Sequence, residues 1–125
     1  MKKNFFCFLM IILVSGSVKA QLANSKWKGL LTLENPVNVI FDFGKDTLTV
    51  INLDENSVLE TMICTVTNST FTLQKISGQS ECPTSIIGKY KYQIKDNALL
   101  MTVVEDACED RAPYLNNLQL KKNTL

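Results

Sequence analysis

The stretch of sequence that decides the fold is GKYKYQIKDNALLMTVVE, residues 88–105. In its first half Tyr90 and Tyr92 alternate with lysine and glutamine, and in its second half Met101 continues the same alternation. A period of two is typical of a β-strand that has one buried face and one wet face. The Asp-Asn dipeptide at 96–97 favours a tight turn. The stretch therefore predicts an antiparallel hairpin.

Working outward, similar short runs are separated by turn residues at intervals of roughly ten residues. The spacing predicts an all-β antiparallel meander of eight strands, which closes into an up-and-down barrel and so removes its edges. A two-sheet β-sandwich is the alternative, and the lack of long crossovers favours the barrel. The six further strands are expected at residues 26–33, 37–43, 47–53, 58–67, 70–76 and 117–122.

The N-terminus has the three parts of a cleavable signal peptide over residues 1–20. A basic start precedes an apolar core over 5–14, and small residues stand before a cleavage point after Ala20. An apolar run of roughly ten residues is too short to span a membrane, and Cys7 lies in a poor context for lipidation. We expect a secreted or periplasmic protein, not a lipoprotein, with one β-barrel domain over 21–125.

Composition excludes several classes of function. Without the three lysines of the signal peptide the chain has ten basic and twelve acidic side chains, a net charge of −2, so a nucleic-acid partner is not expected. Histidine is absent, which removes the commonest general base and transition-metal ligand. The sequence therefore predicts a non-enzymatic protein without a cofactor or metal.

Carboxylates remain as candidate functional groups. Glu60 shares its parity with Met62, which would turn it inward, but the favoured interpretation turns Leu59, Thr61 and Ile63 inward and leaves Glu60 in water. A second group of carboxylates is interpreted as a solvated loop rather than a calcium site. It comprises Glu105, Asp106, Glu109 and Asp110.

Three cysteines remain after signal cleavage. Cys82 and Cys108 both lie in irregular polar segments that flank the hairpin, where two loops can meet at one end of a barrel. We predict a disulfide between them. Cys64 lies in a β-branched strand and is expected to be a buried free thiol.

Four further motifs, with the strand pattern, carry a family resemblance. They are Trp27-Lys28-Gly29, Glu81-Cys82-Pro83, Gly88-Lys89-Tyr90 and DACEDR over 106–111. Together they resemble the small lipocalin-like (calycin-type) β-barrel proteins exported by Bacteroidota. The resemblance implies that Arg111 packs over Trp27 as a cation–π stack that closes one end of the barrel. Ser25 replaces the glycine of full lipocalins and the chain is shorter, which argues against a deep cavity.

The first functional hypothesis is a carrier of a small apolar ligand. Tyr90, Tyr92, Phe41 and Met101 are the candidate pocket residues, because aromatic rings with hydroxyl tips commonly line binding sites. About twenty inward side chains should fill most of the barrel, leaving at most a modest pocket at the end away from the disulfide.

Two other classes of function stay open. A protein–protein module, such as an inhibitor or a cell-surface accessory protein, would use an exposed apolar loop around Ile86-Ile87. A carboxylate-based enzyme is the least favoured class, and it would need paired inward carboxylates.

Overall fold

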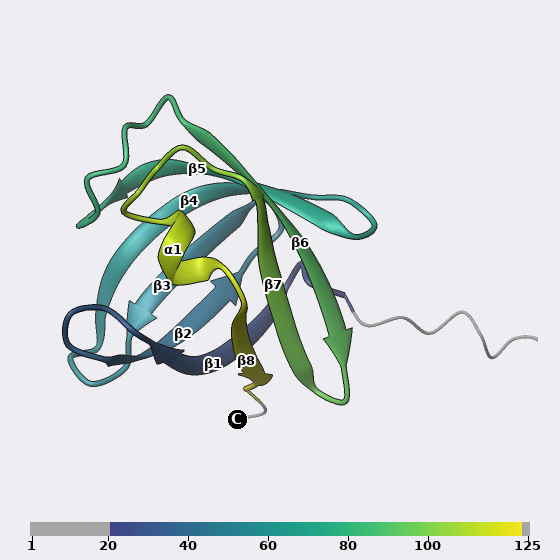
Figure 1. Ribbon diagram of the computed structural model, residues 1–125. Helices are drawn as coiled ribbons and strands as arrows, with labels where there is room; N and C mark the ends of the chain where they lie inside the picture. Colours follow the sequence, from purple (N-terminus) through teal and green to yellow (C-terminus); the bar gives the residue numbers. More distant parts are fainter. Residues whose placement is uncertain (1–20, 124–125) are drawn as a thin grey trace, which may run out of the picture.

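The structure, a computed structural model, describes residues 21–123. The predicted signal peptide over 1–20 lies outside the described residues. Eight strands and one short helix follow in chain order (Figure 1). They are β1 (Ser25–Leu31), β2 (Val37–Phe43), β3 (Thr47–Asn52), β4 (Ser57–Val66), β5 (Thr70–Gly78), β6 (Ile87–Lys95), β7 (Ala98–Glu105), α1 (Ala112–Leu115) and β8 (Leu118–Lys122).

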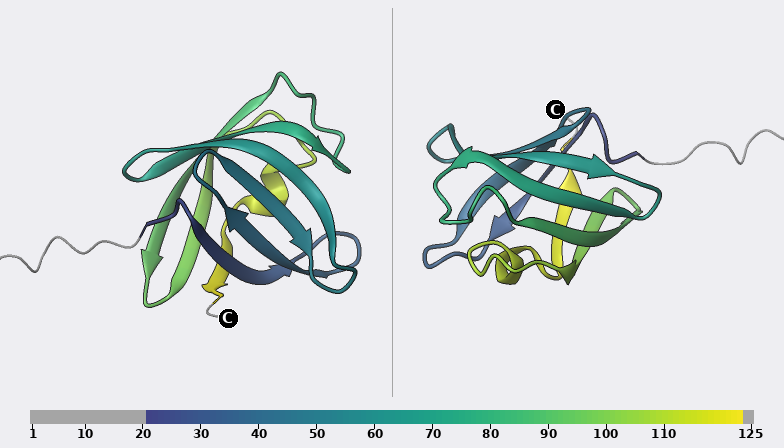
Figure 2. Two further views of the ribbon diagram at one scale, coloured as in Figure 1. Left: turned by 180° about the vertical axis from the view of Figure 1, so that it is seen from behind. Right: turned by 90° about the horizontal axis from the view of Figure 1, so that it is seen from above.

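Each strand pairs antiparallel with its neighbour in the chain, and β1 pairs with β8 to close the ring (Figure 2). The predicted eight-stranded barrel is confirmed, and the β-sandwich is excluded. The closing seam is short, with two residue pairs, Trp27 with Lys122 and Lys28 with Lys121. Strand ends differ from the prediction by one or two residues, chiefly because β1 ends at Leu31 and β5 continues to Gly78.

Aromatic side chains fill the middle of the barrel. The rings of Phe71 and Tyr90 stack with their centroids 5.5 Å apart, and Phe43 meets Phe71 edge-on at 6.0 Å. Each such pair adds about 0.5–1.5 kcal/mol to the burial of apolar surface. Like Trp27, these residues are at most 1% exposed, so this part of the interior is closely packed.

Strand β4 has the opposite phase to the one we favoured. Glu60, Met62 and Cys64 are buried, while Ile63 is 43% exposed. The strand carries an irregularity, because Val50 pairs with Glu60 whereas the next residue of β3 pairs with Val58, so that one residue of β4 is unpaired. A bulge of this kind redirects side chains. The interpretation that left Glu60 in water is therefore wrong.

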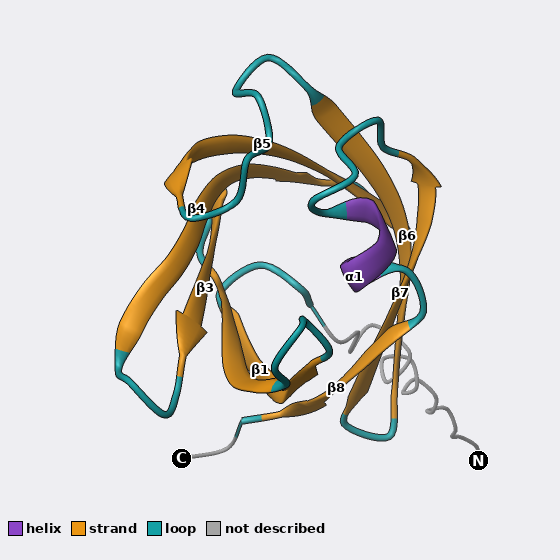
Figure 3. Ribbon diagram, turned by 60° about the vertical axis from the view of Figure 1, so that its left-hand side comes forward, coloured by secondary structure: helices purple, strands orange, loops and turns teal. Residues whose placement is uncertain are grey.

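The chain between β7 and β8 folds over one end of the barrel. Figure 3 shows α1 at this opening, on the side of β7. The helix is a single turn with a proline at its start, and Leu115 is its buried residue. It is far too short to cross a membrane, and the part of the chain that the structure describes contains no helix with the length and apolarity for that.

Candidate functional site

A pocket of about 250 Å³ lies at the end of the barrel where α1 and the two cysteine-bearing loops meet. It is smaller than most sites for drug-sized ligands, which begin near 300 Å³. Its walls are mostly apolar, with a few polar groups contributed largely by the loops. The lining residues are Leu31, Leu33, Phe41, Val50, Leu59, Glu60, Met62, Gln79, Ser80, Asp110, Arg111, Tyr114 and Leu115.

Glu60 forms part of the polar wall. Its Oε1 accepts a hydrogen bond from the Ser80 backbone N–H at 3.1 Å, and its Oε2 accepts a hydrogen bond from the Ser80 hydroxyl. The unpaired residue of the β4 bulge is Leu59, and both Leu59 and Glu60 line the pocket. The bulge thus brings two consecutive residues to the same site.

Gly78, at the end of β5, leaves space for the Glu60 side chain on the neighbouring strand β4. Its φ is +142°, a conformation that glycine adopts readily and other residues rarely do. A Cβ at this position would collide with Glu60 Oε1 and with the Leu59 carbonyl at 2.6 Å. The end of β5 therefore depends on the absence of a side chain here.

Arg111 and Asp106 form a buried ion pair beside the pocket. Arg111 Nε donates to Asp106 Oδ2 at 2.6 Å, and Nη2 donates to Asp106 Oδ1 at 2.9 Å. Nη2 also donates to the Ile86 carbonyl at 3.2 Å. The two side chains are 4% and 0% exposed, and a bidentate geometry of this kind is among the stronger charged contacts in proteins.

Neighbouring groups fix the Asp106 carboxylate in place. The Tyr90 hydroxyl donates to Oδ2, and the Cys108 backbone N–H donates to Oδ1 at 3.0 Å. Gly88 leaves the space for this, since a Cβ there would collide with the carboxylate. Burial by itself raises the pKa of Asp106, but the hydrogen bonds from Arg111, Tyr90 and Cys108 outweigh it and hold the pKa below its usual value. Burial, followed by the hydrogen bond to Asp106, raises the pKa of Tyr90.

Arg111 retains one unused donor. Its Nη1 is buried and has no hydrogen-bond partner. Among residues 21–123 it is the one buried side-chain nitrogen or oxygen atom that lacks a partner. The residue as a whole is 5% exposed, and it lines the pocket. An unsatisfied buried donor costs about 1–3 kcal/mol.

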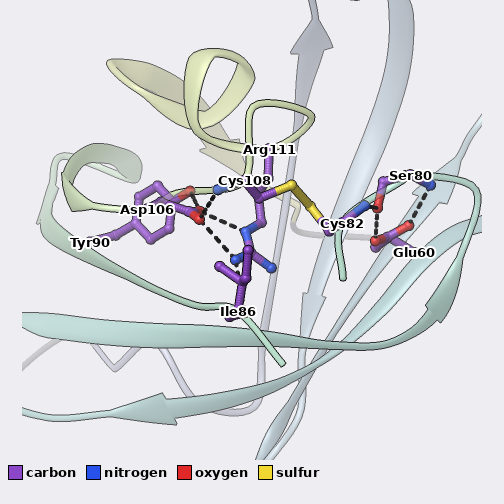
Figure 4. Close-up of polar contacts among 8 residues, drawn as sticks. All are labelled: Glu60, Ser80, Cys82, Ile86, Tyr90, Asp106, Cys108 and Arg111. Atoms are coloured by element: carbon purple, nitrogen blue, oxygen red, sulfur yellow. Dashed lines mark hydrogen bonds and ion pairs between the residues drawn. A yellow bond between two sulfur atoms is a disulfide. The ribbon is translucent and has the colours of Figure 1, made fainter. Parts of the chain in front are cut away.

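The predicted disulfide is confirmed. Cys82 and Cys108 are bonded, with their Cα atoms 5.5 Å apart. In Figure 4 the bridge lies between the Glu60–Ser80 pair and the Arg111–Asp106 pair. Cys64 is free and buried as expected, and burial raises the pKa of its thiol to about 12.

Only one of the four predicted pocket residues lies in the wall of this pocket. Phe41 lines the pocket, whereas Tyr90, Tyr92 and Met101 do not. Tyr90 and Met101 are fully buried packing residues, and the Tyr92 hydroxyl donates to the Thr67 carbonyl at 3.2 Å. The expected location is also wrong, because the pocket opens at the disulfide end, where the loops stand apart enough to leave space.

The predicted stack of Arg111 on Trp27 is likewise incorrect. Arg111 pairs with Asp106, and the cation over the Trp27 ring is Lys122, whose Nζ lies 5.4 Å from the ring centroid. Lys122 reaches the ring because β8 pairs with β1 at this residue. Asp106 must also be removed from the group interpreted as a solvated loop, whereas Glu105, Glu109 and Asp110 are exposed as expected.

The sequence-based selection of pocket residues missed twelve of the thirteen lining residues, among them Glu60, Ser80 and Arg111. The parity of Glu60 with Met62 and Cys64 was the available signal for the first. For the other two no signal existed, because both lie in loops without periodicity. Comparison with protein-family models, with curated proteins and with solved structures found no match to this chain.

Proposed function

We propose that this chain is an exported, lipocalin-like, non-enzymatic protein that binds a small apolar molecule in the pocket at the disulfide end of the barrel. The observation that carries the proposal is the composition of that pocket. Eight aliphatic or aromatic residues form its walls, and its polar groups are few and lie mainly on the loop side. Binding sites for small molecules combine an apolar wall with a few placed polar groups in this way.

Other features support the same reading. The disulfide is typical of proteins that work in an oxidising compartment, such as the periplasm or the extracellular space. Two carboxylates of the wall are held in place by hydrogen bonds, since both oxygens of Glu60 accept hydrogen bonds from Ser80, and Asp110 Oδ2 accepts one from the Glu81 backbone N–H.

A test is titration of small apolar compounds, from single-ring aromatics to short fatty acids and amides, followed by calorimetry. We expect at least one compound to bind the wild type and to lose at least about tenfold in affinity, or about 1.4 kcal/mol, in Leu59→Trp, which fills the pocket. Leu100→Trp is the matched control, because Leu100 is 37% exposed and does not line the pocket. Equal binding by both variants would place the ligand elsewhere.

A protein–protein module is the second candidate, favoured by one observation. Ile87 is 57% exposed and Ile63 is 43% exposed, and both pair with Gln74 from opposite sides, so they lie in one cross-strand row on the outside of the barrel. The two isoleucines are exposed apolar side chains on either side of Gln74, and a partner could cover them. If no small compound binds, this surface becomes the leading candidate.

A further inference from the structure

The charged residues that line the pocket do not balance one another. They are Glu60, Asp110 and Arg111. The Arg111 charge is already offset by Asp106, to which it makes two hydrogen bonds. The ion pairs among residues 21–123 are Arg111–Asp106 and Lys26–Asp42, so within the described chain Glu60 has no cation in direct contact.

One cation, Lys75, is linked to Glu60 indirectly, because both side chains form hydrogen bonds with Ser80. Its Nζ donates to the Ser80 carbonyl, and Lys75 does not line the pocket. Even with Lys75 counted, Glu60 and Asp110 leave this end of the barrel with a net negative charge. A carboxylate entering the pocket would therefore meet like charge, which disfavours binding.

A residue of the pocket wall nevertheless carries a donor that has no acceptor. Arg111 Nη1 is buried without a partner, and the remaining nitrogens of the guanidinium are occupied by Asp106 and the Ile86 carbonyl. Because Asp106 already neutralises the charge, what remains at Nη1 is a hydrogen-bond donor rather than a free cation. An uncharged acceptor, such as an amide or ketone oxygen, satisfies Nη1 without bringing a second negative charge near Glu60.

We infer that the ligand is an apolar molecule with an uncharged acceptor group, and that the pocket discriminates against carboxylates. The inference rests on the proposed function, since it names the class of compound that the same pocket takes. In the inferred complex Arg111 Nη1 donates a hydrogen bond to the acceptor of the ligand, and the negative charge of Glu60 excludes anions.

Three probes with one apolar body test the head-group preference: 3-phenylpropanamide, 3-phenylpropanoate and 3-phenylpropan-1-amine. We expect the amide to bind at least about tenfold more tightly than the carboxylate. Arg111 is the only arginine in the chain, so protein labelled with ¹⁵N-arginine has a single guanidinium spectrum. The amide should shift the Arg111 Nη resonances, and the amine should leave them in place.

The variant Glu60→Gln tests whether the charge of Glu60 disfavours the binding of carboxylates. We expect it to raise the affinity for 3-phenylpropanoate by about three- to tenfold and to change the affinity for the amide little. Glu109→Gln is the matched control, because Glu109 is exposed, does not line the pocket and loses the same charge. Thermal unfolding of both variants shows that they are folded.

The outcomes separate the two proposals. If none of the probes, nor any compound of the wider panel, binds, the carrier function itself fails. If the three probes bind equally tightly, or if the carboxylate binds most tightly, the inference is overturned while the carrier function stands. The same holds if the amine binds most tightly without moving the Arg111 resonances. An unchanged carboxylate affinity in Glu60→Gln also overturns it.

Discussion

At the scale of single residues, the ion pair between Asp106 and Arg111 stabilises the pocket end of the barrel. Both side chains are almost fully buried, and removal of one partner of a buried pair leaves an uncompensated charge that costs about 3–5 kcal/mol. We therefore expect Asp106→Asn to lower the free energy of unfolding by about this amount in urea denaturation at pH 7.

The same pair predicts a pH dependence. The pKa of Asp106 is lowered in the folded protein, so its contribution to stability is complete above the ordinary aspartate pKa and is lost as the pH falls through the lowered value. Denaturation curves from pH 6 to pH 2 should show the wild type losing this contribution below about pH 4, and Asp106→Asn should lack it.

The control for both measurements is Asp42→Asn. Asp42 faces Lys26 at 4.0 Å on the surface, with the two side chains 36% and 59% exposed. Surface pairs of this kind contribute about 0–1 kcal/mol. If the two aspartate variants were equally stable, Asp106 would have no special role.

At the scale of secondary structure elements, the bulged end of β4 and the end of β5 determine the shape of the pocket. We expect Gly78→Ala to destabilise the fold by about 1–3 kcal/mol, because alanine at a positive φ is strained and its Cβ would displace Glu60. Thermal and urea unfolding measure the cost. Ser77→Ala, at the exposed preceding position, should change stability by less than about 0.5 kcal/mol, and a similar loss in both variants would argue against the role of φ.

Prediction from the sequence is most successful for strands and least successful for loops, for a physical reason. Alternation in a strand such as β6 records which side chains face the interior, because each strand is half buried. It does not record how far along the barrel axis each residue lies, so Tyr90 and Met101 are correctly inward but belong to the solid middle rather than the pocket. The bulge at Leu59 breaks the alternation locally.

Loop placement depends on contacts between residues distant in the sequence. The irregular segments around Cys82 and Cys108 suggested a disulfide, and that inference is confirmed. Their fold over the pocket end, which sends Arg111 to Asp106 rather than to Trp27, follows from burial of an ion pair that no periodic pattern reveals. For this reason the fold could be predicted while most of the site could not.

At the scale of the whole molecule, the disulfide is the covalent link between the two loops at the pocket end. It joins residues with a sequence separation of 26, and the chain-entropy model assigns such a loop about 3–4 kcal/mol. We expect the double variant Cys82→Ala, Cys108→Ala to lose about this much free energy of unfolding. A reducing agent should lower the stability of the wild type and leave the double variant unchanged, and an effect on both would point to another cause.

The short seam between β1 and β8 has one more consequence. Because Trp27 pairs with Lys122 and the Asn123 N–H donates to the Lys26 carbonyl at 2.9 Å, the first and last strands are hydrogen-bonded neighbours in the ring. The order of strands around the ring does not depend on which connection is left open. A circular permutant, with a short linker joining β8 to β1 and new ends placed in the hairpin at Asp96-Asn97, would have the same neighbours throughout and the same pocket at the opposite end from its termini.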